Sequence, residues 1–104
     1  MKKIINGLRY DTEIADEIGY DGEGGGRDFG HWGETLYRTP RGKRYFLLGE
    51  GGPLTRYATR SGDNMWTDGK KIVPLTDDAA FAWAQEHLDG DGCEAAFGEV
   101  IDEA

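Results

Sequence analysis

Glycine-rich stretches are the first places in this sequence where residue types suggest chemistry. Residues 22–26 read GEGGG and residues 49–52 read GEGG. A loop of this kind binds phosphate when it joins a strand to the first turn of a helix and a Lys or Arg is fixed nearby. Residues 22–26 instead follow an acidic segment predicted to be helical, and residues 49–52 precede Pro53 without a GK[ST] motif. We therefore interpret neither stretch as a nucleotide site.

The carboxylates, the two histidines and the cysteine are the candidate metal ligands of this chain. Residues 89–93 read DGDGC, which resembles the start of a calcium loop. Such a loop needs glycine at its sixth and glutamate at its twelfth position, where this chain has Glu94 and Val100. The two histidines and the cysteine form no CxxC or HxxxH pair of the kind found in zinc sites. We predict no metal and no cofactor.

Cys93, the single cysteine, is the remaining candidate nucleophile. A reactive thiol needs a positively charged environment to lower its pKa, whereas Asp89, Asp91 and Glu94 surround this one in the sequence. Its spacing to later apolar residues indicates a core position in a helix. No serine triad motif is present, and the carboxylates are too numerous for an acid and base pair to be chosen. We predict no catalytic residues and no enzymatic activity.

The charges are unevenly distributed along the chain. The net charge is -8, and residues 76–104 hold nine acids with no Lys or Arg, whereas residues 35–75 carry a net +5. An acidic segment attracts basic surfaces and repels nucleic-acid phosphates. A solvated acidic face that keeps the protein soluble is the alternative interpretation. Arg38, Arg41, Lys43 and Arg44 lie close together, but the overall charge argues against direct nucleic-acid binding.

The predicted partner-binding surface combines exposed acids of residues 76–104 with two tryptophans from loops, since tryptophan often anchors an interface. The basic segment around Arg41 and the glycine-rich loop are alternative surfaces. The predicted set is Asp78, Glu86, Asp89, Asp91, Glu94, Glu99, Trp32 and Trp66.

Turn signals predict two hairpins. Asn6-Gly7 is the strongest sequence signal for a two-residue hairpin turn, because both residues tolerate a positive φ. Residues 40–43 read PRGK, which also favours a turn between alternating segments. The first hairpin has strands at residues 2–5 and 8–11, and the second has strands at residues 34–39 and 44–49.

Helices are predicted where apolar residues recur at helical spacing. Ile14, Ala15 and Ile18 suggest a short helix over residues 12–18, followed by a loop over residues 19–33. Thr76 can cap a second helix, whose apolar side includes Phe81, Trp83 and Leu88, and a third helix starts near residue 93. Residues 70–75 are predicted as a strand, at a sheet edge because of Pro74.

These elements predict an α+β fold in a single domain, residues 1–104. Its small antiparallel sheet consists of two hairpins plus one strand, with one short N-terminal helix and two C-terminal helices. The predicted core is Ile4, Leu8, Ile14, Ile18, Leu36, Tyr45, Leu47, Ile72, Phe81, Trp83, Leu88, Phe97 and Val100.

The location of the protein is predicted from two further features. Residues 1–10 contain no apolar run typical of a secretory signal peptide. A single cysteine cannot form a disulfide within the chain. We expect a cytoplasmic protein with no membrane partner.

Several segments resemble a known group of proteins: KKIING, RYDT, ETLYR, YFLLGEGG, KKIVPLT, AWAQEHL and AAFGEV. In this order they are similar to small acidic proteins of phages, plasmids and conjugative elements, which include anti-CRISPR and anti-restriction proteins. The resemblance implies an inhibitor that binds a CRISPR-Cas effector or other DNA-binding nuclease through an acidic surface and blocks its engagement of DNA. A non-catalytic regulatory or structural module of a mobile element is the alternative.

Overall fold

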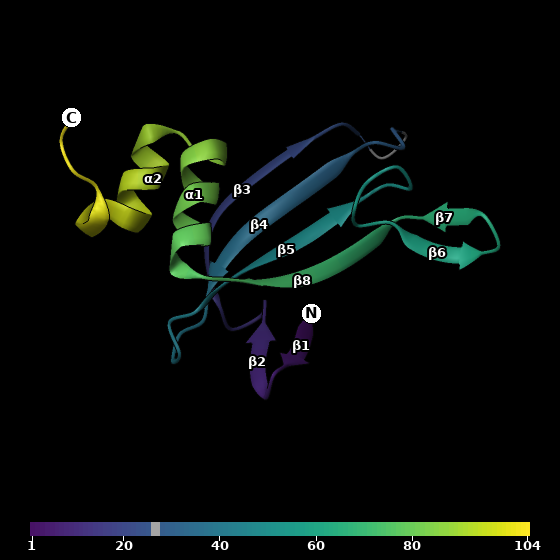
Figure 1. Ribbon diagram of the computed structural model, residues 1–104, viewed down its shortest axis with the longest axis horizontal. Coiled ribbons are helices and arrows are strands. Elements are labelled where there is room, and N and C mark those ends of the chain that lie inside the picture. Colours follow the sequence, from purple (N-terminus) through teal and green to yellow (C-terminus); the bar gives the residue numbers. More distant parts are fainter. Residues whose placement is uncertain (26–27) are drawn as a thin grey trace.

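The computed structural model describes residues 1–25 and 28–104, of which 43% lie in strands and 22% in helices. The strands are β1 (Lys2–Ile5), β2 (Leu8–Asp11), β3 (Asp16–Glu23), β4 (Trp32–Arg38), β5 (Tyr45–Gly51), β6 (Thr59–Gly62), β7 (Met65–Thr67) and β8 (Gly69–Leu75). The helices are α1 (Asp77–His87) and α2 (Gly90–Phe97), followed by a 3-10 turn (Gly98–Val100). Figure 1 shows both helices at one end of an elongated molecule and the β6–β7 hairpin at the other.

A four-stranded antiparallel sheet with the order β3-β4-β5-β8 forms the centre of the molecule. β5 begins with four apolar residues whose side chains alternate between the two faces, as expected of a central strand that is covered on both sides. Pro74 lies on β8 at the edge of the sheet, as predicted, where a missing backbone N–H does not interrupt a ladder.

The two C-terminal helices cover one face of this sheet, and their presence confirms the prediction. Thr76 Oγ1 accepts a hydrogen bond of 3.1 Å from Ala79 N at the start of α1, and Asp89 caps α2 through Gly92 N at 2.7 Å. The apolar sides of the helices pack on the sheet in one cluster. The buried members of this cluster are Leu36, Tyr45, Leu47, Ala80, Trp83, Ala84, Cys93 and Phe97.

The β1–β2 hairpin packs against the opposite face of the sheet, below it in Figure 1. Its turn has positive φ at Asn6 (52°) and Gly7 (77°), as the sequence predicts. Tyr10 contacts Phe46 edge to face, with ring centroids 5.4 Å apart. The hairpin is a separate two-stranded sheet, so the prediction that both hairpins share one sheet was wrong.

The predicted N-terminal helix over residues 12–18 is also wrong, and the fold is mainly β, not the α+β fold we expected. A single turn follows β2, with Ala15 N bonded to Asp11 O at 3.0 Å, and β3 then begins at Asp16. The spacing of a few apolar residues could not distinguish a short helix from a strand. Pairing of β3 with β4, with an irregularity at Ile18, satisfies more backbone groups than one isolated helical turn would.

Two further predictions were wrong. Parts of the expected loop over residues 19–33 belong to β3 and β4; Gly26 and Arg27 of that loop lie outside the described residues. Four predicted core residues are exposed, because the N-terminal hairpin covers the sheet with Tyr10 instead and the 3-10 turn faces solvent. They are Ile4 at 61%, Leu8 at 37%, Ile14 at 58% and Val100 at 60% exposure.

In the part of the chain that the structure describes, neither helix has the length and apolar composition needed to cross a membrane.

The burial pattern predicts how strongly two apolar residues stabilise the fold. Leu36 is fully buried between sheet and helices, so Leu36→Ala is expected to lower the free energy of unfolding by about 2 to 5 kcal/mol through lost burial and the cavity that remains. Ile4→Ala, at an exposed position, is expected to cost less than about 1 kcal/mol. Chemical denaturation measures both, and similar losses would contradict the assignment of the core.

Candidate functional site

Glu34 is the buried charged residue of this fold: among the described residues no other Asp, Glu, Lys or Arg is buried. It lies in β4 with 6% of its surface exposed, on the face that the helices cover. A buried carboxylate is costly unless hydrogen-bond donors replace the water it has lost. The neighbours of Glu34 supply these donors, and they define the candidate site.

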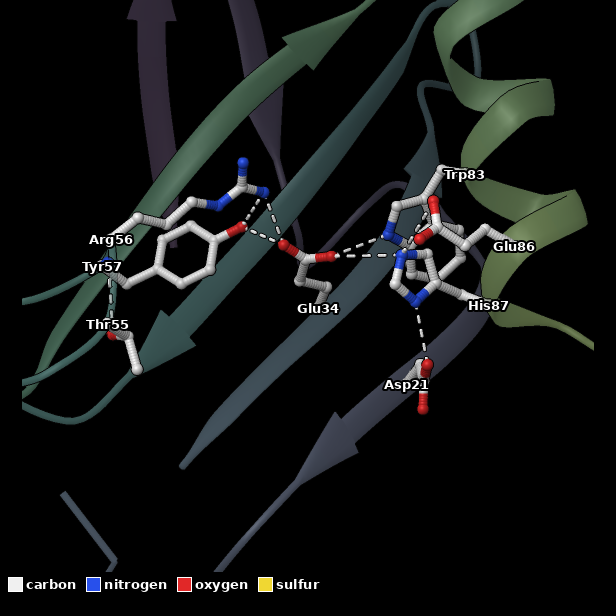
Figure 2. Close-up of polar contacts among 8 residues, drawn as sticks. All are labelled: Asp21, Glu34, Thr55, Arg56, Tyr57, Trp83, Glu86 and His87. Carbon is white, nitrogen blue, oxygen red and sulfur yellow. Dashed lines mark hydrogen bonds and ion pairs between the residues drawn. The ribbon is translucent and has the colours of Figure 1, made fainter. Parts of the chain in front are cut away.

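Three side chains donate hydrogen bonds to this carboxylate (Figure 2). Trp83 Nε1 on α1 donates to Oε1 at 2.8 Å. Arg56 Nη2 donates to Oε2 at 2.6 Å, and the Tyr57 hydroxyl donates to the same oxygen. The donors come from α1 and from the loop between β5 and β6, so one carboxylate joins the sheet to two separate segments.

A glycine in β5 explains how Tyr57 reaches the carboxylate. Gly49 pairs with Glu34 across the strands, and a Cβ atom at Gly49 would overlap the Tyr57 ring. The ring therefore lies flat over a position without a side chain, and its hydroxyl points at the neighbouring strand. Arg56 in turn lies over the Tyr57 ring, with its Cζ 4.9 Å from the ring centroid. Arg56 remains largely exposed while its guanidinium group contacts Glu34.

His87, in the last turn of α1, completes the site. Its ring stacks on Trp83 with centroids 4.7 Å apart and meets the edge of Trp32 at 5.8 Å. Its Nδ1 lies 2.8 Å from Asp21 Oδ2 on β3. Its Nε2 lies 3.9 Å from Glu34 Oε1 and 4.0 Å from Glu86 Oε2. The imidazole is thus held by aromatic rings on two sides and by a carboxylate at one nitrogen.

The local environment changes two pKa values. Burial alone would raise the pKa of Glu34, but the hydrogen bonds from Tyr57, Trp83 and Arg56, with the charge of Arg56, outweigh it and lower this pKa from its ordinary 4.5. Burial and the hydrogen bond to Glu34 raise the pKa of Tyr57 from 10.0 to about 12. Glu34 is therefore held as an anion and Tyr57 as a neutral donor.

A cleft of about 530 Å³ opens beside these residues, between the C-terminal end of α1 and the loop before β6. The rings of Trp32, Tyr57 and His87 contribute to its lining, together with Glu34. The residues that line it are Trp32, Glu34, Thr55, Arg56, Tyr57 and His87.

The neighbours of His87 in this site are mainly carboxylates and aromatic rings. Asp21 orients the His87 ring through Nδ1, but the groups nearest to Nε2 are the two carboxylates of Glu34 and Glu86. No hydroxyl or thiol is paired with Nε2 in the described structure, as an activated nucleophile would require. Across residues 1–25 and 28–104, no cluster of three or more His, Cys, Asp or Glu side chains is arranged to hold a metal ion.

The structure places the six predicted acids on α1, its α2 junction, α2 and the following 3-10 turn, and all six are exposed. Trp32 is half-buried and lines the cleft. Its ring contacts His87, whose Nε2 lies 4.0 Å from Glu86 Oε2. Trp66 lies on the distant β6–β7 hairpin and is 55% exposed. The structure therefore brings Trp32 close to one of the acids but separates Trp66 from them (Figure 1).

The sequence analysis missed Asp21, Glu34, Arg56 and Tyr57. One signal was available: in β4 the alternating pattern places Glu34 on the same face as Leu36, which was predicted to be buried. A carboxylate at a core-facing strand position requires partners. The sequence did not show which residues those partners are.

Comparisons with protein-family models, with curated proteins and with solved structures find no match to this chain.

The hydrogen bond from Trp83 can be tested with a conservative substitution. Trp83→Phe keeps an aromatic ring in the core but removes the donor to Glu34 Oε1, and we expect it to lower the free energy of unfolding by about 1 to 3 kcal/mol because a buried acceptor loses its partner. Trp66→Phe is the matched control at an exposed site and should stay within about 0.5 kcal/mol of wild type. If denaturant melts show the same loss of unfolding free energy for Trp83→Phe and Trp66→Phe, the hydrogen bond to Glu34 does not stabilise the fold as proposed.

The lowered pKa of Glu34 predicts how stability depends on pH. A carboxyl group with a lower pKa in the folded state stabilises that state above its unfolded pKa, here near 4.5, and the contribution is lost as pH falls through the folded value. The stability difference between wild type and Glu34→Gln should therefore be largest near about pH 7 and shrink below about pH 4.5. The exposed Glu94→Gln serves as the control, and a Glu34→Gln difference that does not vary with pH would refute the assignment.

Proposed function

We propose that this chain acts by binding another macromolecule through the acidic surface of α1, α2 and the 3-10 turn, and that it catalyses no reaction. The observation that carries this proposal is the state of the acids. All six predicted carboxylates are exposed. Four of them, Asp78, Asp91, Glu94 and Glu99, have neither an ion pair nor a side-chain hydrogen bond within residues 1–25 and 28–104. Their charges are available to a basic partner.

The two helices offer these charges from a fixed base. Phe81 of α1 and Phe97 of α2 pack with ring centroids 5.2 Å apart, and Phe97 also stacks on Tyr45 of the sheet at 5.4 Å. A rigid arrangement loses less conformational entropy on binding than a flexible acidic tail. Complementary charges mainly raise the association rate and the specificity, while single exposed pairs contribute little.

The sequence resemblance supports a more specific role. We propose a mobile-element inhibitor of a bacterial defence nuclease, anti-CRISPR-like, acting in the cytoplasm. Cas9-type nucleases hold nucleic acid in a positively charged channel, and a rigid array of carboxylates can occupy such a channel and exclude DNA. A regulatory or structural module of a mobile element is the second candidate, because it would use the same acidic surface on another basic protein.

The test uses the variant Glu94→Lys, Glu99→Lys and Asp102→Lys in combination. These acids are exposed, and the variant leaves Asp89, which caps α2, and Glu86, which lies beside His87, unchanged. Against a panel of purified CRISPR-Cas effectors, we expect wild type to block DNA binding by at least one effector. The triple variant should bind that effector at least about tenfold more weakly, or about 1.4 kcal/mol.

The matched control is Glu13→Lys, Asp16→Lys and Glu17→Lys, which changes the net charge equally at exposed sites on β3 and the turn before it, outside the two helices. It should lose much less affinity than the triple helix variant if the acidic helices form the interface. Equal losses would show that net charge alone matters and would contradict the proposed surface. A panel in which wild type blocks no effector would contradict the inhibitor role and favour the regulatory module.

A further inference from the structure

Hydrogen-bond acceptors of Glu34 and His87 face each other in the cleft, and no donor of the described residues lies between them. Glu34 Oε2 accepts bonds from Arg56 and Tyr57, whereas Oε1 accepts one, from Trp83. A carboxylate oxygen accepts about two hydrogen bonds, so Oε1 retains one acceptor position. In a neutral His87 ring whose Nδ1–H donates to Asp21, the other nitrogen is also an acceptor.

The distances around His87 Nε2 suit a bridging donor. Glu34 Oε1 is 3.9 Å away and Glu86 Oε2 is 4.0 Å away. Both distances exceed a normal hydrogen bond, yet one nitrogen atom that carries several N–H groups could contact all three acceptors. In Figure 2 the side chains of Glu34, Glu86 and His87 point toward one another.

The charge and the walls of the cleft favour a cation. Glu34 and Arg56 line the cleft, and Asp21 and Glu86 lie beside it, each with a carboxylate oxygen within 4.0 Å of a His87 ring nitrogen, so the group contains three carboxylates and one guanidinium. Trp32 lines the cleft, and the faces of tryptophan rings attract cations. An anion would meet only the partly neutralised Arg56.

The shape of the free acceptor position favours an ammonium over a guanidinium group. A guanidinium binds a carboxylate best through two parallel hydrogen bonds, one to each oxygen. Arg56 and Tyr57 already occupy Oε2 of Glu34, so this fork cannot form. An ammonium is a compact donor with three N–H groups, which matches single acceptors on Glu34, His87 and Glu86.

We propose that this cleft is a recognition site for a primary alkylammonium group. The ammonium nitrogen donates to Glu34 Oε1 and His87 Nε2, its third N–H faces Glu86, and its alkyl chain lies along Trp32. A lysine side chain and a free small amine share this chemistry. The proposal does not depend on the acidic helices binding a protein partner, because a small molecule can probe the cleft directly and Glu86 is the one proposed contact that also belongs to the acidic surface.

The test follows the indole N–H signals of the three tryptophans by NMR while n-butylammonium chloride is added at about pH 8, where free imidazole is neutral and a primary amine is protonated. Signals of Trp83 and Trp32 should shift with saturation, while that of Trp66, at the distant hairpin, should not. Sodium chloride at equal ionic strength and sodium acetate should give no saturable shift. The proposal is overturned if the ammonium does not shift the signals of Trp83 and Trp32, or if the signal of Trp66 shifts with them. Saturable binding of acetate would also overturn it.

Two substitutions connect binding to the acceptors. His87→Phe keeps a ring between Trp83 and Trp32 but removes Nε2, and should weaken n-butylammonium binding at least about tenfold, or about 1.4 kcal/mol. Glu86→Gln, at a mostly exposed side chain, should weaken it several-fold, whereas the control Glu94→Gln should not change it. Thermal melts verify that each variant is folded. If Glu86→Gln and His87→Phe both bind n-butylammonium as tightly as wild type does, the assigned acceptors are refuted.

The two sources of the ammonium group are distinguished by lysine blocked at its backbone amine and carboxyl. Binding of blocked lysine, lost when its side chain is acetylated, supports a lysine side chain as the ligand. Binding of n-butylammonium alone supports a free small amine. Neither measurement involves a protein partner, so failure here and failure of the acidic surface to bind an effector are separate results.

Discussion

The burial of one carboxylate, that of Glu34, constrains the rest of this structure. An ionised group removed from water destabilises a fold by several kcal/mol unless donors surround it. The donors here are Trp83 from α1 and Arg56 and Tyr57 from the loop before β6. Helix and loop must therefore both be docked on the sheet before Glu34 is satisfied. This requirement couples the positions of segments that have few apolar contacts with each other.

The same constraint divides the helix-facing side of the sheet into two parts. Around Leu36 and Leu47 the surface is apolar and the helices cover it closely. Two residues along the strands, a row across β3, β4 and β5 consists of the carboxylates of Asp21 and Glu34 and of Gly49, which has no side chain. On this row the contact with α1 is a hydrogen bond from Trp83 to Glu34 instead of apolar packing, because a buried carboxylate needs donors. The cleft lies where the close packing ends.

Local signals in the sequence predicted the parts of the fold that local interactions determine. The Asn6-Gly7 turn and the helix cap at Thr76 depend on residues within a few positions, and both were predicted correctly. The strand β3 depends on its partner β4, so a short apolar pattern around Ile18 was mistaken for a helix. The site escaped prediction for the same reason. The donors to Glu34 lie 22, 23 and 49 positions away in the sequence, and no local rule relates them.

The carboxylates of this protein serve two different physical purposes. Exposed acids such as Glu94 are hydrated, and each can contribute only a little to binding, so together they would favour fast, salt-sensitive approach of a basic partner. Glu34 is desolvated and held by fixed donors, so a cation that reached it would be selected by shape as well as charge. Glu86 lies at the boundary, exposed on α1 yet 4.0 Å from His87 Nε2. If both proposals hold, a basic partner attracted to the helices could insert a lysine beside Glu86, and the surface that sets the rate of approach would adjoin the cleft that sets specificity.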